Sequence, residues 1–282
     1  MNITITEDDR MLSDALNRFC QEVIAPKAAE IDEGSLSSTC HRQALSDIGI
    51  MGMNLPEACG GTGVSAVALY LAVENLAGAC GSTASMVTAH FLATDSILLG
   101  GTEAQKQAWL PDAATGSKLG AFALTEPAAG SNPAAMRTFA EKTATGYRLR
   151  GVKHFISNAA EADFLVVYAK TDKSAGHRGI SAFIVDRHSA GIEVASPERT
   201  MGLKGDMYSK SRWTAKCRRK TCSAASRATA FVPPCRCSTT VVSKSPPVAP
   251  ASPAPPMRLR CSGPIPARST TIRSASSRDC SG

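Results

Sequence analysis

The apolar residues near the start of the chain recur with the period of an α-helix. Thr6 can cap such a helix, Asp9 lies favourably in its first turn, and Pro26 marks its predicted end. The spacing therefore predicts one amphipathic helix between Thr6 and Pro26. Its apolar face consists of Leu12, Ala15, Leu16, Phe19 and Val23.

Four further helices are predicted before residue 117. Helical runs cover residues 40–50, 66–79 and 82–99, and the last two are apolar on most faces. We therefore expect those two at the centre of a helical bundle. Thr102–Gln105 has the pattern of a capping box, which opens a short helix that should end near Pro111.

Beyond Gly116 the pattern changes from the helical period to short β-type runs separated by Gly, Asn, Asp and Ser. This change predicts an α+β protein, with an all-α N-terminal domain over residues 1–117 and a β domain over residues 118–205. The expected strands cover residues 119–124, 146–150, 162–169 and 180–185.

The composition changes abruptly after Met201–Gly205. The chain contains 31 Lys and Arg against 24 Asp and Glu, but residues 206–282 hold 14 of the basic residues and only two of the acidic ones. Residues 1–205 are left with 17 basic and 22 acidic residues, so an acidic body carries a basic tail. Six of the ten cysteines lie in the tail at irregular spacing, and no histidine follows His188. No metal site is expected.

The sequence shows neither the pattern of a targeting signal nor that of a membrane-spanning helix. The first ten residues are too acidic for a secretion or transit signal. The longest apolar stretch, Ser82–Leu99, contains His90 and Asp95 and has the pattern of a buried helix. We expect no membrane span and a cytoplasmic protein.

Two loops of the β region carry candidate chemistry. Phe122–Ser131 runs from a strand into a turn of small residues in which Thr125, Glu126 and Ser131 are expected to be exposed. Lys153–Asn158 places an aromatic and a hydroxyl at another strand end. Amides and hydroxyls at such turns can hydrogen-bond a flat polar ring or a phosphate. An ordinary strand-end turn explains either loop taken alone.

In order and spacing, these segments resemble the acyl-CoA dehydrogenase family. Its Thr-Glu-Pro-Gly-Ala-Gly-Ser-Asp loop is similar to Thr125–Asn132, its Trp-Ile-Thr-Asn strand end to Phe155–Asn158, and its Met-Gly-x-x-Gly turn to Met201–Gly205. The loop Pro56–Gly61 is also similar to the family's Pro-Glu-x-Tyr-Gly-Gly, with Cys59 in the tyrosine position. The resemblance spans nearly all of residues 5–205.

The resemblance implies a helical domain, a β-barrel-like middle domain and a C-terminal four-helix domain, with FAD between the last two. It also implies an acyl-CoA substrate, a glutamate that removes the α-proton, hydride transfer to FAD, and electron-transfer flavoprotein or a similar acceptor. Members of the family are homo-oligomers. The positions matching the family's flavin-binding residues are Phe122, Leu124, Thr125, Phe155, Ile156 and Ser157, and Ser131 matches a residue that contacts the CoA portion of the substrate.

Three other polar residues are assigned structural roles. His154 is expected to point away from Phe155 on a strand, as a surface or packing residue. His90, in an apolar helix, has the setting of a core histidine with satisfied hydrogen bonds. Glu126 is rejected as the catalytic acid because the family places its base far downstream.

The tail has two simple interpretations, a disordered basic extension and a nucleic-acid-binding arm. It lacks interleaved aromatic residues and a binding motif, so no nucleic-acid partner is expected. A third interpretation is a frameshift near residues 206–212. Read one nucleotide out of frame, the codons of Trp213–Ser223 permit Asp-Gly-Lys-Val-Pro-Pro-Glu-Asn-Leu-Leu, which is similar to family sequence. Phe231–Lys244 and Ser276–Ser281 likewise permit family segments.

On this hypothesis the catalytic glutamate and the four-helix domain lie in the lost frame, and residues 206–282 should be largely disordered. We then expect an acyl-CoA dehydrogenase by descent, inactive as this chain, with no catalytic residue among those present. Two alternatives remain open: a flavin monooxygenase of the same fold, and a non-catalytic remnant or interaction module with a basic arm.

Overall fold

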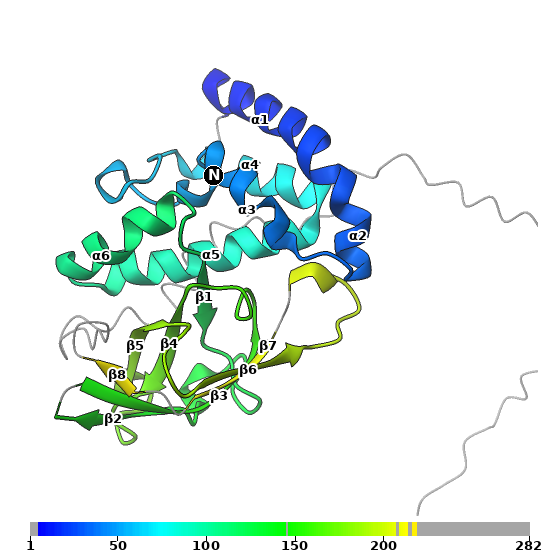
Figure 1. Ribbon diagram of the computed structural model, residues 1–282. Helices are drawn as coiled ribbons and strands as arrows, with labels where there is room; N and C mark the ends of the chain where they lie inside the picture. The colour runs from blue at the N-terminus through cyan, green and yellow to red at the C-terminus, as the bar shows by residue number, and fades with distance from the viewer. Residues whose placement is uncertain (1–4, 145, 207–208, 214–215, 219–282) are drawn as a thin grey trace, which may run out of the picture. The chain divides into compact units, whose positions relative to one another are not determined.

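The computed structural model describes residues 5–144, 146–206, 209–213 and 216–218, and these form a helical part followed by a mixed β-sheet (Figure 1). The predicted α+β class, with helices before strands, is confirmed. The α-helices are α1 (Glu7–Phe19), α2 (Ala28–Glu33), α3 (Arg42–Asp47), α4 (Ala66–Ala79), α5 (Gly81–Gly100) and α6 (Glu103–Ala114). Short helical turns are η1 (Cys20–Ile24), η2 (Ala25–Lys27), η3 (Ser38–His41), η4 (Ile50–Gly52), η5 (Glu57–Cys59), η6 (Pro133–Ala135), η7 (Gly176–Gly179) and η8 (Lys204–Asp206).

The first helix begins where the sequence predicts. The Thr6 hydroxyl accepts a hydrogen bond from the Asp9 amide at 3.1 Å, and the Asp9 carboxylate accepts one from the Thr6 amide at 3.0 Å. The predicted end at Pro26 is wrong, because the chain continues through η1 and η2 into α2. Pro26 lies in the first turn of η2, where a missing N–H breaks no helical bond.

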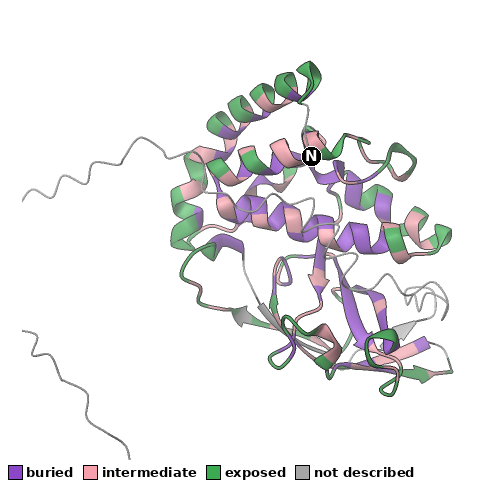
Figure 2. Cartoon of the chain, turned by 180° about the vertical axis from the view of Figure 1, so that it is seen from behind, coloured by how far each residue is buried: buried purple, intermediate pink, exposed green. Residues whose placement is uncertain are grey.

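The other helical predictions are confirmed with two changes. The run predicted over residues 40–50 is divided into α3 and flanking turns, because Gly49 adopts a left-handed backbone with φ of 76°. The helix predicted to end near Pro111 continues to Ala114, because the Thr115 amide still donates to the Pro111 carbonyl at 3.1 Å. Most of α5 is buried, as its apolar pattern predicts (Figure 2).

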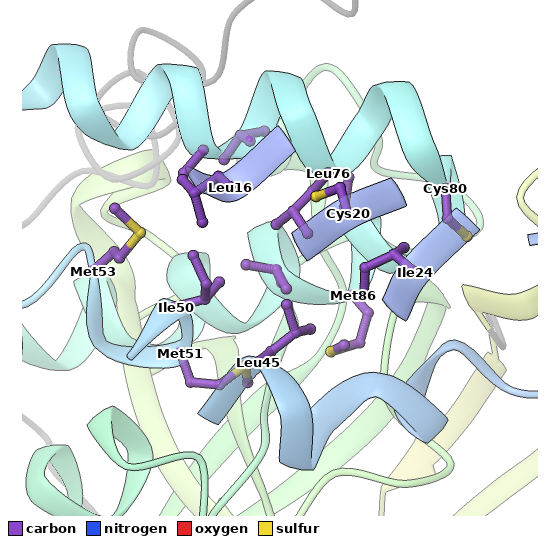
Figure 3. Close-up of a cluster of buried hydrophobic side chains, with 14 of the residues drawn as sticks. Leu16, Cys20, Ile24, Leu45, Ile50, Met51, Met53, Leu76, Cys80 and Met86 are labelled. Atoms are coloured by element: carbon purple, nitrogen blue, oxygen red, sulfur yellow. The ribbon is translucent and has the colours of Figure 1, made fainter. Parts of the chain in front are cut away.

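Side chains from α1, η1, α3, α4, α5 and the turns after α3 converge on one helical core (Figure 3). Removing apolar surface from water stabilises this packing by about 25 cal/mol per Å². The side chains labelled in this view are Leu16, Cys20, Ile24, Leu45, Ile50, Met51, Met53, Leu76, Cys80 and Met86.

The sheet has the order β1-β4-β2-β3-β7-β6, with β5 paired to β4 and β8 paired to β3. β1 runs parallel to β4, whereas β2 with β3 and β4 with β5 form antiparallel pairs. The four predicted strands are present. Four others were not predicted: β2, β6, β7 and β8. The strands are β1 (Gly120–Ala123), β2 (Phe139–Thr143), β3 (Gly146–Ile156), β4 (Phe164–Lys170), β5 (Ile180–Asp186), β6 (Ile192–Pro197), β7 (Ser209–Trp213) and β8 (Lys216–Arg218).

The sheet continues past the composition break after Gly205. β7 pairs with both β3 and β6, and β8 pairs with the start of β3. The predicted limits of the three regions at residues 117 and 205 stay predictions. Residues 206–282 were expected to be largely disordered, and β7 and β8 are described within this range. Residues 219–282 lie outside the described residues.

The helical and β parts meet where β1 crosses α5, at Gly120. Its amide donates to His90 Nδ1 at 2.9 Å, and its carbonyl accepts from Asn158 Nδ2 at 3.1 Å. A Cβ at this position would lie 2.7 Å from the Phe164 ring and 2.9 Å from the Ala93 Cβ. Only glycine therefore allows the strand to approach the helix this closely.

The prediction for His90 is confirmed: it is a buried core histidine, and both of its ring nitrogens have hydrogen-bond partners. Because Nδ1 accepts from Gly120, the proton of the neutral ring lies on Nε2, which faces the Ala113 carbonyl at 3.2 Å. Burial lowers the pKa of His90 to about 4.

The buried ring of His90 should make the fold sensitive to acid. The unfolded chain protonates this imidazole near pH 6.5 and the folded chain only near pH 4, so the unfolded state holds the extra proton between these values. The free energy of unfolding should therefore fall as the pH is lowered through this window, by up to about 1.4 kcal/mol per pH unit. Chemical denaturation of wild type and His90→Gln across this range checks the prediction. An equal pH slope in both proteins would contradict it.

Candidate functional site

The two loops selected from the sequence lie side by side in the structure. The His154 amide donates to the Thr125 carbonyl at 2.9 Å, and Lys153 Nζ donates to the Leu124 carbonyl at 2.9 Å. The chain leaving β1 is thereby fixed against the end of β3. Leu124 and Thr125 come close to Phe155 as a result.

A tight turn shapes the first loop. The Glu126 and Ala129 main chains exchange hydrogen bonds of 3.1 and 3.0 Å. The Glu126 carboxylate accepts from the amides of Arg137 and Thr138 at 2.6 and 3.0 Å. These bonds account for both carboxylate oxygens and give Glu126 a structural role. The expected exposure of Glu126 is therefore wrong, because its carboxylate turns inward to these amides and the residue is buried.

Glu126 also forms a buried ion pair with Lys153, with Nζ and Oε1 separated by 2.9 Å. Burial lowers the pKa of Lys153 to about 8, although the Glu126 carboxylate opposes this shift. Burial raises the pKa of Glu126, but Lys153 and the backbone amides outweigh it and leave that pKa below its ordinary value. Both groups are therefore charged at neutral pH.

Phe155 combines an exposed ring with a strained backbone. The residue is 53% exposed, and its φ of 53° lies in the left-handed region that non-glycine residues rarely adopt. The pairing of β3 with β7 shifts register between Lys153 and Ile156, around this residue. Such strain concentrates at functional sites, where the side chain must point in a particular direction.

The left-handed backbone also changes the position of His154. A regular strand would place His154 and Phe155 on opposite faces, but their ring centroids lie 4.1 Å apart. The expected opposite orientation is therefore not observed, because the alternation breaks at Phe155. His154 Nε2 lies 2.7 Å from Glu198 Oε1, which agrees with a packing role.

The next two predicted site residues differ in what they can offer a ligand. The Ile156 side chain is buried in the β core, so only its main chain can reach a ligand. The Ser157 hydroxyl donates to Asp206 Oδ2 at 3.1 Å, and the same carboxylate oxygen accepts from Ser85. Because the Ser157 hydroxyl hydrogen is used in the bond to Asp206, the hydroxyl oxygen can act toward a ligand only as a hydrogen-bond acceptor.

The remaining predicted site residues lie around the place where the two loops meet. Phe122 and Leu124 are half-buried against the core between α5, α6 and the sheet, and the Phe122 ring lies 5.2 Å from the Tyr168 ring. Ser131 is exposed beyond the Glu126–Ala129 turn. The contacts described above thus join Leu124 and Thr125 to the end of β3, but they do not extend to Phe122 or Ser131.

Sequence reasoning gave no role to Lys153, Asn158 or Asp206. Asn158 has a left-handed φ of 63° and donates to the Met86 carbonyl at 2.9 Å, which anchors the β3 end to α5. Lys153 shares its strand face with the buried Leu149. A lysine at an inward strand position requires a counter-charge, so the strand pattern could have marked Lys153 as paired, although it does not name Glu126 as the partner.

The arrangement suits a flat ring with polar edges. The Phe155 ring offers an aromatic face, Ser157 offers an acceptor, and Thr125 adds a half-buried hydroxyl. The part of the chain that the structure describes contains no group of three or more metal-ligand side chains. No described helix is long and apolar enough to cross a membrane.

Both parts of the chain match models of one protein family. Residues 6–117 match the acyl-CoA dehydrogenase N-terminal domain, and residues 121–214 match the acyl-CoA dehydrogenase middle domain. The short/branched chain specific acyl-CoA dehydrogenase of Rattus norvegicus is 36% identical over 202 residues, which are 71% of this chain and 46% of the relative. The chain spans about half the length of the curated relatives it matches.

Solved structures agree with these matches. Butyryl-CoA dehydrogenase from Megasphaera elsdenii has a TM-score of 0.77 and 29% identity, over 86% of this chain and 64% of that chain. A glutaryl-CoA dehydrogenase from Mycobacterium smegmatis in complex with FADH2 has a TM-score of 0.77 and 28% identity, over 84% and 60% of the two chains.

The strain at Phe155 predicts a stabilising substitution. Glycine adopts the left-handed backbone without the Cβ penalty, so Phe155→Gly should raise the free energy of unfolding of the ligand-free chain by about 1 kcal/mol. Phe155→Ala removes the ring but keeps the Cβ, so it should give no such gain. Urea denaturation of the three proteins measures this difference, and equal stability of the Gly and Ala variants would show that the backbone is not strained.

Proposed function

The chain belongs to the acyl-CoA dehydrogenase family, and we propose that residues 6–214 form the FAD-binding and substrate-facing half of an enzyme that desaturates acyl-CoA thioesters. The observation that carries this proposal is the exposed, backbone-strained Phe155 beside Thr125 and Ser157. When bound, FAD supplies the acceptor for a hydride from the β-carbon of the acyl group.

We assign the flavin contacts to residues on both loops. The Phe155 ring would pack against the isoalloxazine, and Ser157 would accept a hydrogen bond from it. Thr125 would bond the pyrimidine side, while the half-buried Phe122 and Leu124 would provide apolar contact. Ile156 would contribute main-chain groups only, because its side chain is in the core.

The acyl-CoA thioester would reach the site past the exposed turn that follows Thr125. Ser131 is an exposed residue just beyond this turn, and we assign it to the CoA portion of the substrate.

We propose that this chain does not complete turnover. Three described carboxylates hydrogen-bond the site segments. Glu126 and Asp206 are buried and held by other groups, and Glu198 is held by the His154 ring. We assign none of them as the base that takes a proton from a substrate carbon, which would have to lie within hydrogen-bond reach of it. The family's glutamate base is assigned to the sequence read out of frame.

The frameshift near residues 206–212 is itself a proposal. Its support is the change in composition after Gly205, the family segments permitted by the shifted codons, and the end of the family match at residue 214. Resequencing the locus tests it. Electron-transfer flavoprotein as acceptor, homo-oligomerisation and a cytoplasmic location also remain proposals.

Titration of the full 282-residue chain with FAD tests the proposed site. Wild type should bind FAD and quench or shift its fluorescence, and Phe155→Gly should bind about tenfold more weakly because it lacks the ring. Met11→Ala is the control, since Met11 is an exposed apolar side chain on α1 away from the loops. Absence of FAD binding by wild type, or unchanged affinity in Phe155→Gly, would contradict the proposal.

The same preparation tests the expected lack of turnover. Addition of an acyl-CoA should leave the flavin of this chain oxidised, whereas a frame-corrected chain should bleach it. Bleaching by the chain as it stands would show that a base is present after all.

A further inference from the structure

We propose that the buried Lys153–Glu126 ion pair is a positioning device, which holds the main chain of Leu124 and Thr125 against Phe155 so that the flavin contacts face one another. The inference rests on the proposed FAD site. It assigns a role to two residues that do not themselves touch the ligand.

The pair is almost completely removed from water. The Lys153 side chain is 0% exposed and the Glu126 side chain is 4% exposed, and Nζ lies 2.9 Å from Oε1. The same ammonium donates to the Leu124 carbonyl at 2.9 Å. One cation on β3 therefore holds two points of the loop that follows β1.

The carboxylate extends this connection to a third segment. Glu126 accepts from the Arg137 amide at 2.6 Å and from the Thr138 amide at 3.0 Å, just before β2. The loop after β1, the start of β2 and the end of β3 thus share one charged centre. Hydrogen bonds to charged groups are stronger and more directional than those between neutral groups.

Stability alone does not account for this pair. Burying two charges costs desolvation energy that can exceed their mutual attraction. A protein with an apolar pair of similar volume in the same place is often equally stable. The distinctive consequence of the pair is the orientation of the Leu124 carbonyl. The next residue, Thr125, is held by the His154 amide, directly beside Phe155. Loss of the pair would free the loop from the strand that carries the aromatic ring.

Variants can separate positioning from stability. Lys153→Met or Glu126→Gln alone leaves one buried charge unpaired, so each should be strongly destabilised. The double variant Glu126→Gln/Lys153→Met leaves no unpaired charge, and the side-chain carbonyl introduced at position 126 still offers an acceptor to a backbone amide. We expect it to resist denaturant better than either single variant, yet to bind FAD about tenfold more weakly than wild type, with an altered visible circular dichroism of the bound flavin.

A second ion pair, more exposed than the first, provides the control. Arg42 Nη2 lies 2.8 Å from Asp163 Oδ2, and this pair joins α3 to the start of β4 without contacting either loop. Arg42→Met/Asp163→Asn should lower stability while leaving FAD affinity and the flavin spectrum unchanged.

Full-length wild type, the Glu126/Lys153 double variant and the control are compared by FAD titration, circular dichroism and denaturation. Weakened, spectrally altered FAD binding in the double variant alone supports the positioning role. Wild-type affinity and spectrum in the double variant, or equal losses in the control, would overturn it. Failure of wild type to bind FAD would instead refute the proposed function, and the inference with it.

Discussion

The close approach of β1 to α5 at Gly120 is the constraint on which the rest of the structure depends. Without a Cβ, the strand passes the helix closely enough for its amide to reach His90 and for its carbonyl to reach Asn158. Asn158 in turn donates to the Met86 carbonyl of α5. One glycine therefore joins the helical core, the first strand and the end of β3.

Both loops of the candidate site leave from this junction. The first loop follows β1 directly, and the second ends at Asn158. Their relative position is then refined by the hydrogen bonds of Lys153 and His154 to the first loop. The strained backbone of Phe155 persists because its neighbours on β3 are fixed. Lys153 and Ile156 are both buried, and both pair with β7.

The sequence predicts the helical part well because its apolar spacing is long and regular, as in α4, whose bounds match the prediction. The expectation that a helix ends at a proline misplaced two helix ends. Pro26 and Pro111 each lack one amide donor, but the backbone hydrogen bonds of the residues that follow are intact. Strands β2 and β6 escaped prediction because one is short and charged and the other ends in a proline. The candidate loops were found by motif, but the buried Lys153–Glu126 pair depends on a tertiary contact that no local pattern records.

The central claim is that the loops after β1 and at the end of β3 together form the flavin site. Hydrogen exchange of the full chain with and without FAD tests it most directly, because bound ligand slows exchange of the backbone it covers. We predict slower exchange in peptides covering residues 122–131 and 153–158, with α1 unchanged. Protection confined to other segments, or none on addition of FAD, would contradict the account.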